Sequence, residues 1–188
     1  KATPLNAFEK KETEYKCGSA IPVPDASWKD FNSGDRFGGR DKHFWLVKEV
    51  EIPAELIEKT ENEETYLTYS LSSYGDLALN PQLMFYINGV LVQGGDNNHR
   101  EVSLPATLKK FNLAIYVYSG MPTPDVNGTL SVPDFALSFS LMKKNKLAEK
   151  VYYDIKVLID SARLQEENTK EFFELKAGLK EICSVLDF

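Results

Sequence analysis

The dipeptide Asn88-Gly89 lies between two apolar runs and constrains the fold more than any other feature of the sequence. Residues 82–87 precede it in an alternating β-type pattern, and residues 90–93 follow it. An Asn-Gly pair in this setting predicts a β-hairpin, because a type I′ turn needs positive φ angles at both central residues. The apolar residues are nearly continuous, so we expect both faces of the hairpin to be covered, as in a sandwich core.

Further β-type segments share two properties: they are rich in β-branched, aromatic or alternating residues, and Gly, Pro or Asn separates them. They are residues 43–52, 65–71, 101–104, 111–118 and 134–141. Several such segments in sequence predict a mainly β fold, an antiparallel β-sandwich of the jelly-roll or galactose-binding-like kind.

After residue 148 the apolar period becomes helical. Two apolar stripes at three-four spacing predict two helices, and a single bent helix is the alternative. The stripes are Tyr152, Ile155, Ile159 and Ala162, then Phe172, Leu175, Leu179, Ile182 and Leu186. We expect the break at residues 165–168, where Asn168 and Glu171 resemble a capping box. A glycine inside a helix costs about 1 kcal/mol against alanine, so Gly178 predicts close packing there.

These patterns predict three parts: an N-terminal strap at 1–27, a β-sandwich ancillary domain at 28–148, and a helical linker at 149–188. A disordered tail is the alternative for the strap. The second helical stripe reaches the last residues, so the helices either pack back on the sandwich or belong against something outside the chain. We therefore expect the chain to be a fragment whose linker leads to a missing catalytic domain.

Composition narrows the classes of partner. The formal net charge is −6 and no basic face is evident, which argues against nucleic-acid binding. No apolar run reaches the length of about 18 residues that a transmembrane helix needs, and no signal peptide is visible, so no membrane is expected. Cys17 and Cys183 lie near opposite ends, which predicts no disulfide framework and a reducing, cytoplasmic location. With two histidines and two cysteines widely scattered, no metal site is expected in this chain.

Two loops are candidates for chemistry. The Gly-rich segment 34–43 precedes a strand rather than a helix, so it predicts a turn and not a phosphate cradle. The hairpin exit is the candidate contact loop for a glycan or a neighbouring domain, because ligand sites tend to lie on loops held by a rigid scaffold. Its residues are Asp96, Asn97, Asn98, His99 and Arg100. The alternative, which these residue types favour, is a loop whose side chains bond their own backbone.

Aromatic residues offer a possible sugar-stacking face. They are Trp28, Trp45, Tyr74, Tyr86, Tyr116 and Tyr118. Aromatics at alternating positions more often belong to a core or a sheet surface than to a ligand platform. Trp45 is expected on the face opposite Phe44 and Leu46. No nucleophile elbow and no HExxH sequence is present, so no catalytic residue is assigned.

Three stretches together resemble the N-terminal region of α-mannosidases of glycoside hydrolase family 38. They are residues 36–45 with Trp28 and Ile52-Pro53, residues 85–102, and residues 151–158. The pattern G-x-D-x-N-H-R-E runs from Gly94 to Glu101, and Tyr152-Tyr153-Asp154-Ile155 opens a helix. In that family a β-sandwich ancillary domain precedes a helical linker and a catalytic α/β barrel.

The resemblance implies a parent enzyme that hydrolyses α-mannosides with retention, using an Asp nucleophile and a divalent metal, usually zinc. The family's catalytic domain opens with a His-x-His-x-Asp-like strand, which this sequence lacks. A retaining site needs two carboxylates about 5 Å apart, and no matched position supplies either. The resemblance therefore implies an inactive, cofactor-free fragment that scaffolds the catalytic domain and a possible homo-oligomer. A free-standing carbohydrate-binding module and a structural or interaction domain are the alternatives.

Overall fold

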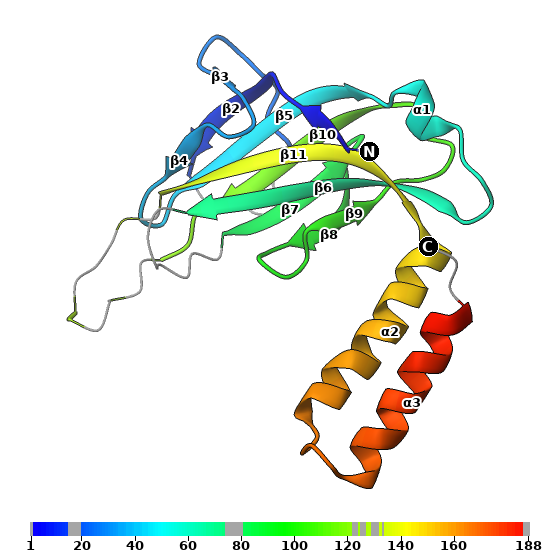
Figure 1. The fold of residues 1–188 in the computed structure, drawn as a ribbon. Helices are drawn as coiled ribbons and strands as arrows, with labels where there is room; N and C mark the ends of the chain where they lie inside the picture. Colours follow the sequence, from blue (N-terminus) through cyan, green and yellow to red (C-terminus); the bar gives the residue numbers. More distant parts are fainter. Residues whose placement is uncertain are drawn as a thin grey trace. The chain divides into compact units, whose positions relative to one another are not determined.

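The computed structural model describes residues 2–14, 20–73, 81–121, 124, 127–128, 132 and 134–185 (Figure 1). The chain divides into two compact units, Lys1–Thr60 with Glu64–Lys143, and Glu61–Glu63 with Lys144–Phe188. The first unit is an antiparallel β-sandwich and the second contains two helices. The predicted mainly β class followed by two helices is confirmed.

Two antiparallel sheets form the sandwich. The β11 sheet contains, in spatial order, β1 (Ala2–Leu5), β11 (Asp134–Asn145), β6 (Glu63–Ser73) and β9 (Glu101–Ser103), and β4 (Arg36–Gly38) also pairs with β11. The β10 sheet contains β3 (Lys29–Phe31), β2 (Phe8–Thr13), β5 (His43–Glu51), β10 (Lys110–Tyr118), β7 (Gln82–Ile87) and β8 (Val90–Gly95). From β4 onward, consecutive strands alternate between the sheets, except for the β7–β8 hairpin. The N-terminal strands β1 and β2 pair with β11 and β5, within the sandwich unit.

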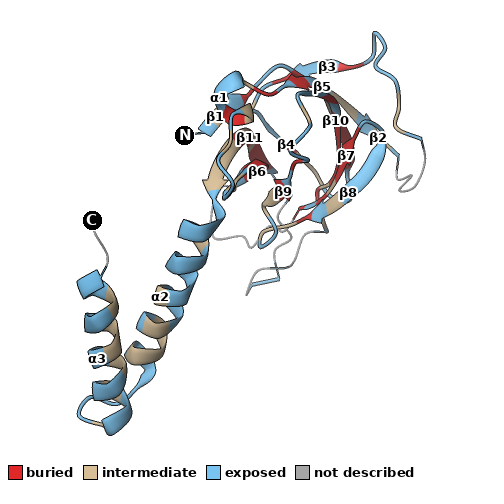
Figure 2. Cartoon of the chain, turned by 90° about the vertical axis from the view of Figure 1, so that its right-hand side faces the viewer, coloured by how far each residue is buried: buried red, intermediate tan, exposed pale blue. Residues whose placement is uncertain are grey.

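Aromatic side chains fill the space between the sheets, and Figure 2 shows the buried positions on the strands of both. Phe139 of β11 is fully buried, and its ring centroid lies 5.2 Å from that of Phe8 on β2. The rings of Phe37 and Phe135 lie 4.8 Å apart. Alternation places one set of side chains from each strand in this core.

A second buried cluster lies on the outer face of the β10 sheet. Trp45, Tyr86 and Tyr116 are buried there and belong to a cluster separate from the main core. Trp45 therefore lies opposite Phe44 and Leu46, as predicted. These aromatics act as sheet packing and not as an exposed platform.

The β7–β8 hairpin has the predicted turn. Ile87 pairs with Val90, and the two residues between them have φ angles of 49° (Asn88) and 83° (Gly89). The prediction that both faces are covered holds for β7, where Phe85 and Tyr86 are both buried, and is wrong for β8, which ends the strand order of its sheet. Val90 is 64% exposed, and its two successors are also exposed. An apolar run does not distinguish an edge strand from a central one.

Three helices are described: α1 (Ala54–Ile57), α2 (Lys146–Leu164) and α3 (Lys170–Val185). The side chain of Asn145 caps α2 by accepting from the Ala148 amide at 3.0 Å. The break after Leu164 confirms two helices rather than one bent helix. Among the described helices, none is long and apolar enough to cross a bilayer.

Two details of α3 correct the sequence prediction. The capping residue is Thr169, whose Oγ1 accepts from the Phe172 amide at 3.2 Å. Asn168 has a φ of 74°, in the left-handed region, whereas an N-cap residue is extended. Gly178 is not closely packed, because a Cβ placed there meets no atom within 4 Å. Leu186 of the predicted stripe lies outside the described residues.

Candidate functional site

The predicted contact loop, residues 96–100, is held by bonds among its own groups. Asp96 Oδ1 accepts from the amides of Asn98 at 2.7 Å and His99 at 2.9 Å, and it contacts His99 Nδ1 at 2.9 Å. Arg100 Nε donates to the Asn97 carbonyl at 2.7 Å. The amide donors, Asn98 and His99, lower the pKa of Asp96 below its usual value. The carboxylate therefore stays ionised at neutral pH, which suits a positioning or binding group rather than a general acid.

The loop is also anchored to the sandwich core. The Tyr69 hydroxyl donates to the backbone carbonyls of Asp96 at 2.6 Å and His99 at 3.2 Å. Burial raises the pKa of this hydroxyl, so it remains a donor. A Cβ on Gly95 would lie 2.7 Å from Phe85 Cε2 and 2.9 Å from Tyr69 Oη, so only glycine fits. The structure thus shows the self-bonded arrangement, and a contact role for the loop stays a prediction.

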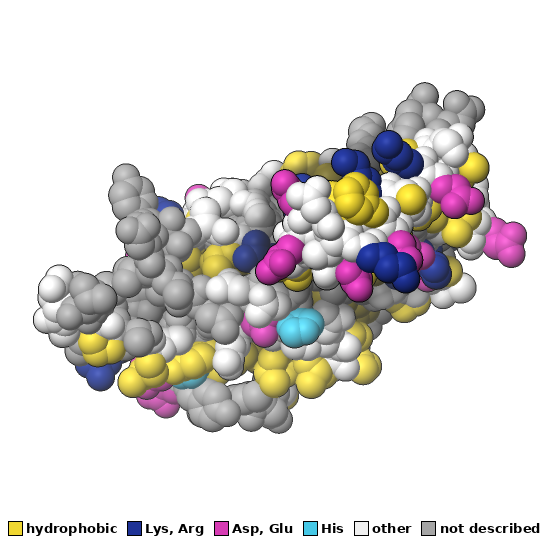
Figure 3. All heavy atoms as spheres, turned by 60° about the horizontal axis from the view of Figure 1, so that its bottom comes forward, with side chains coloured by type: hydrophobic (Ala, Val, Ile, Leu, Met, Phe, Trp, Pro, Cys, Tyr) yellow, Lys and Arg dark blue, Asp and Glu magenta, His cyan; other side chains and the backbone are white. Residues whose placement is uncertain are grey.

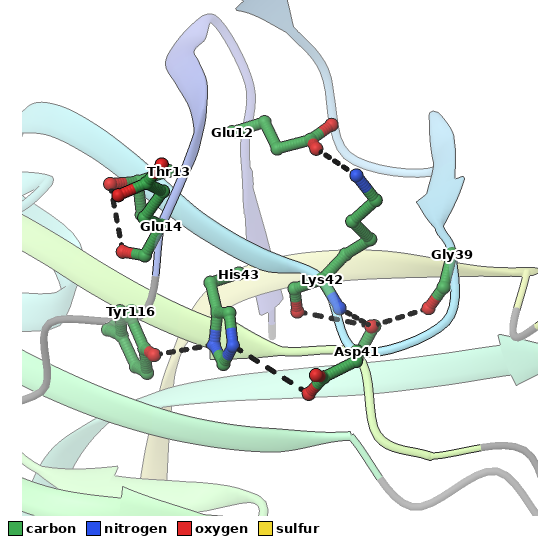
Figure 4. Close-up of polar contacts among 9 residues, drawn as sticks. Glu12, Thr13, Glu14, Gly39, Asp41, Lys42, His43 and Tyr116 are labelled. Atoms are coloured by element: carbon green, nitrogen blue, oxygen red, sulfur yellow. Dashed lines mark hydrogen bonds and ion pairs between the residues drawn. The ribbon is translucent and has the colours of Figure 1, made fainter.

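A second polar group lies nearby on the outer face of the β10 sheet, where β5 begins and β10 ends (Figure 4). His43 is buried, and its Nδ1 lies 2.7 Å from the Tyr116 hydroxyl. Its Nε2 lies 3.9 Å from Asp41 Oδ1. The His43 ring stacks on Tyr118, with ring centroids 4.9 Å apart and planes 16° apart. His43 and Tyr118 face each other across the ladder, so the register of β5 and β10 creates this stack.

Asp41 and Tyr118 complete this group. Asp41 has a φ of 54°, and its amide donates to the Gly120 carbonyl at 3.1 Å. The Tyr118 hydroxyl and the Asp41 carboxylate interact electrostatically. Partial burial, with Asp41 adding to it, raises the pKa of Tyr118, so its hydroxyl stays protonated and donates. The glycine-rich segment 34–43 contains the short strand β4, and the predicted turn lies in its second part, where Asp41 precedes β5 and His43 begins it.

The loop and this polar group line one groove. It has a volume of about 840 Å³, and we name it the Gly94 groove after the exposed glycine in its wall. The other lining residues are Asp41, His43, Gln82, Leu83, Met84, Gly95, Asp96, His99, Tyr116 and Tyr118. Figure 3 shows histidine side chains beside acidic and hydrophobic ones on this face of the molecule. The structure therefore brings Asp96 and His99 together with residues more than fifty positions earlier in the chain.

Sequence reasoning found only part of this groove. Of the aromatic residues proposed as a stacking face, Tyr118 is half-buried, whereas Trp28, Trp45, Tyr86 and Tyr116 are buried. Tyr74 lies outside the described residues. The contributions of Asp41, His43 and Gln82 were not predicted. The i, i+2 spacing of Asp41 with His43, and of Tyr116 with Tyr118, was the available signal for a shared location.

The metal implied by the family resemblance finds no ligand set here. Among the described residues, no group of three His, Cys, Asp or Glu side chains could hold a metal ion. Cys183 is an exposed free thiol, and Cys17 lies outside the described residues. No chemical step is therefore assigned to a metal in this chain.

Comparison with known proteins gives little beyond this geometry. No protein-family model and no curated protein matches the sequence. The β-D-mannosidase of Dictyoglomus thermophilum is similar in structure, with a TM-score of 0.38 and 13% sequence identity. The match covers 65% of this chain and 16% of that chain. Neither the family models nor the curated proteins identify glycoside hydrolase family 38, so that identification stays a prediction.

Proposed function

We propose that this chain is a non-catalytic region of a glycoside hydrolase, a retaining α-mannosidase. The sandwich and helices scaffold the catalytic domain of that enzyme and its assembly into an oligomer. Three motifs support the proposal, in the order and spacing that the family has. The observation that carries it in the structure is the exposed apolar surface of the helical unit.

The two helices of this unit bury little of their apolar surface. Neither α2 nor α3 contains a buried residue, and Figure 2 shows both in tan and pale blue only. Only part of the predicted stripes is half-buried, among them Ile155, Phe172 and Leu175, whereas Tyr152 and Ile159 of the α2 stripe are exposed. Surface beyond these stripes remains apolar: Val157 is 62% exposed and Leu164 is 84% exposed. An exposed apolar surface of this kind marks an interaction site more often than an ordinary surface does.

The motif residues themselves lie on this exposed surface. Tyr152 and Tyr153, which carry the resemblance, are 59% and 55% exposed; they lie inside α2 and not at its start as expected, because α2 begins at Lys146. Their rings contact each other at 5.3 Å between centroids. A tyrosine pair that the fold of its own unit does not bury is suited to packing against another body, because tyrosine combines apolar area with a polar tip. In the proposal that body is the catalytic domain.

The test is to express the complete coding sequence and assay hydrolysis of an aryl α-mannoside with and without a zinc chelator. The proposal expects a His-x-His-x-Asp strand beyond Phe188, chelator-sensitive activity, and loss of oligomer or activity in the Tyr152→Ser, Tyr153→Ser double variant. Lys150→Ser is the matched control, because Lys150 is exposed on the same helix and forms only an i,i+4 pair with Asp154. Absence of both the strand and the activity would overturn the proposal.

A further inference from the structure

Gly94 is an exposed glycine inside a strand, and its own backbone does not require glycine. Its φ is not positive, and a Cβ placed on it would meet only the Leu83 carbonyl, at 3.8 Å. The adjacent Gly95 is different, because packing against Phe85 and Tyr69 excludes any side chain there. A glycine within a strand weakens it and often marks a place where a ligand approaches the backbone closely. Gly94 fits that description, since the missing side chain leaves room on the exposed surface.

The position of Gly94 identifies what surrounds this space. Gly94 pairs with Met84, and Met84 pairs with Tyr116 on the next strand. Met84 packs against the outer aromatic cluster, so all three positions lie on the outer face of the β10 sheet. The space over Gly94 is therefore bordered by an apolar surface from Met84 and the tyrosines of β10, Tyr116 and Tyr118.

Polar groups border the same space and are mostly hydrogen-bond acceptors. Asp41, the exposed Gln82, Asp96 and His99 all line it. Gln82 pairs with Tyr118 across β7 and β10, so the two groove residues are neighbours in the sheet. Asp41 is 61% exposed at its side chain, so its carboxylate can accept from a ligand. Few polar groups around an apolar patch are typical of small-molecule sites.

We propose that the Gly94 groove binds a neutral pyranoside sugar, with the sugar ring over Gly94 and its hydroxyls on Asp41 and Gln82. The apolar C–H face of a pyranose matches the Met84 and Tyr118 surface, and its hydroxyls donate to the Asp41 carboxylate. Two carboxylates in the groove disfavour an anionic ligand. An organic cation is less suited, because Asp96, one of the two carboxylates, already accepts two backbone amides and contacts His99. This site goes beyond the scaffold role and does not depend on it.

The test is a titration of the chain, labelled with nitrogen-15, with methyl α-D-mannopyranoside and methyl α-D-glucopyranoside, followed by amide NMR shifts. The site predicts saturable shifts at residues 82–84, 94–95 and 116–118 with at least one of the two sugars. Gly94→Leu should abolish these shifts, because its side chain fills the space while the backbone tolerates it. Asp41→Asn should weaken binding by about tenfold, the loss expected for a charge-assisted hydrogen bond. Asparagine tolerates the left-handed conformation of this position.

Val92→Leu is the matched control for the glycine variant. Val92 lies on the same strand, is 45% exposed, and is not part of the groove lining, so its variant should bind as the parent chain does. Amide spectra without sugar that match the parent chain away from the substituted strand establish that each variant is folded. Absence of saturable shifts with both sugars would overturn the site, as would binding that survives Gly94→Leu. Choline, titrated in the same way, is the cation probe, and saturable shifts with choline but with neither sugar would overturn the sugar site in favour of a cation site. None of these outcomes bears on the α-mannosidase proposal.

Discussion

The sandwich and the helical unit use apolar residues in opposite ways. In the sandwich, side chains from both sheets bury one another, and a second aromatic cluster covers part of the outer face of the β10 sheet. In the helical unit no helix residue is buried, although α2 and α3 carry clear apolar stripes. Side-chain packing therefore stabilises the first unit, whereas in the second the contact between α2 and α3 buries side chains only in part.

The helical unit also contains short-range ion pairs. Lys150–Asp154 and Lys156–Asp160 join residues one turn apart on α2. Pairs of this kind contribute little in an exposed helix, because solvent screens them. Two helices that bury no residue are marginal in water, because helix nucleation is unfavourable and most helical stability in proteins comes from tertiary packing. The contrast predicts that substitutions in the two units change the free energy of unfolding by different amounts. For glycine-to-alanine substitutions, it also predicts changes of opposite sign.

Phe139→Ala should produce the largest effect. Phe139 is fully buried and its ring contacts Phe8 and Tyr69, so its loss removes apolar burial and leaves a cavity. We expect a loss of about 3–5 kcal/mol in the free energy of unfolding of the sandwich. Denaturant unfolding followed by near-ultraviolet circular dichroism measures this. Val157→Ala on the exposed surface of α2 is the counterpart, and a comparable loss there would contradict the contrast.

Gly95→Ala should destabilise the sandwich by about 1–3 kcal/mol, the cost of overpacking a filled site. The added Cβ would lie 2.7 Å from Phe85 Cε2 and 3.2 Å from the His99 carbonyl, and the backbone atom cannot move aside freely. Gly94→Ala on the same strand is the control, since its Cβ meets only the Leu83 carbonyl at 3.8 Å. Equal unfolding midpoints for the two variants would show that the core does not fix the loop.

Gly178→Ala should have the opposite sign. A Cβ at this position of α3 meets nothing within 4 Å, so alanine adds helix propensity without a clash. We expect the helix to gain about 0.5–1 kcal/mol. Far-ultraviolet circular dichroism at 222 nm during thermal unfolding would detect the gain as later loss of helical signal. A loss of helix in this variant would indicate a contact at Gly178 that the hairpin alone does not show.

Asp96→Asn should have the smallest effect, and that effect should depend on pH. The amide donors of Asn98 and His99 lower the pKa of Asp96 in the folded chain. A carboxyl group with a lowered pKa in the folded chain stabilises the fold at pH values above its pKa in the unfolded chain, about 3.9. This stabilisation is lost as the pH falls through the pKa of the folded chain. The stability difference between the parent chain and the variant should therefore shrink below about pH 4. Urea unfolding from neutral to acid pH tests this, and a difference that grows on acidification would contradict it.

The sequence predicts best where one local rule decides the structure. Asn88-Gly89 predicts its turn because positive φ is needed at both positions, and the observed angles agree. Residues 165–168 predict the helix break because the first apolar stripe ends before them and a capping pattern follows. The cap of α3 is missed by one residue because Asn168 and Thr169 are both good capping residues, and only the left-handed φ of Asn168 excludes it.

Features that depend on strand order or register could not be predicted. The exposure of Val90 follows from the place of β8 at the end of its sheet, which no local pattern specifies. The His43–Tyr118 stack requires the pairing of two strands far apart in sequence. The polar loop at 96–100 was found from composition, but its place in a shared groove with Asp41 emerged only from the fold.

Hydrogen exchange of backbone amides in the intact chain tests the central contrast most directly. The account predicts that amides of β5, β10 and β11 exchange only through global unfolding. Each of these strands lies between two others in its sheet and contributes buried side chains to the core. Amides of α2 and α3 should exchange much faster, through local opening of helices that contain no buried residue. Equal protection in the two units would contradict the claim that side-chain burial stabilises the sandwich much more than the helical unit.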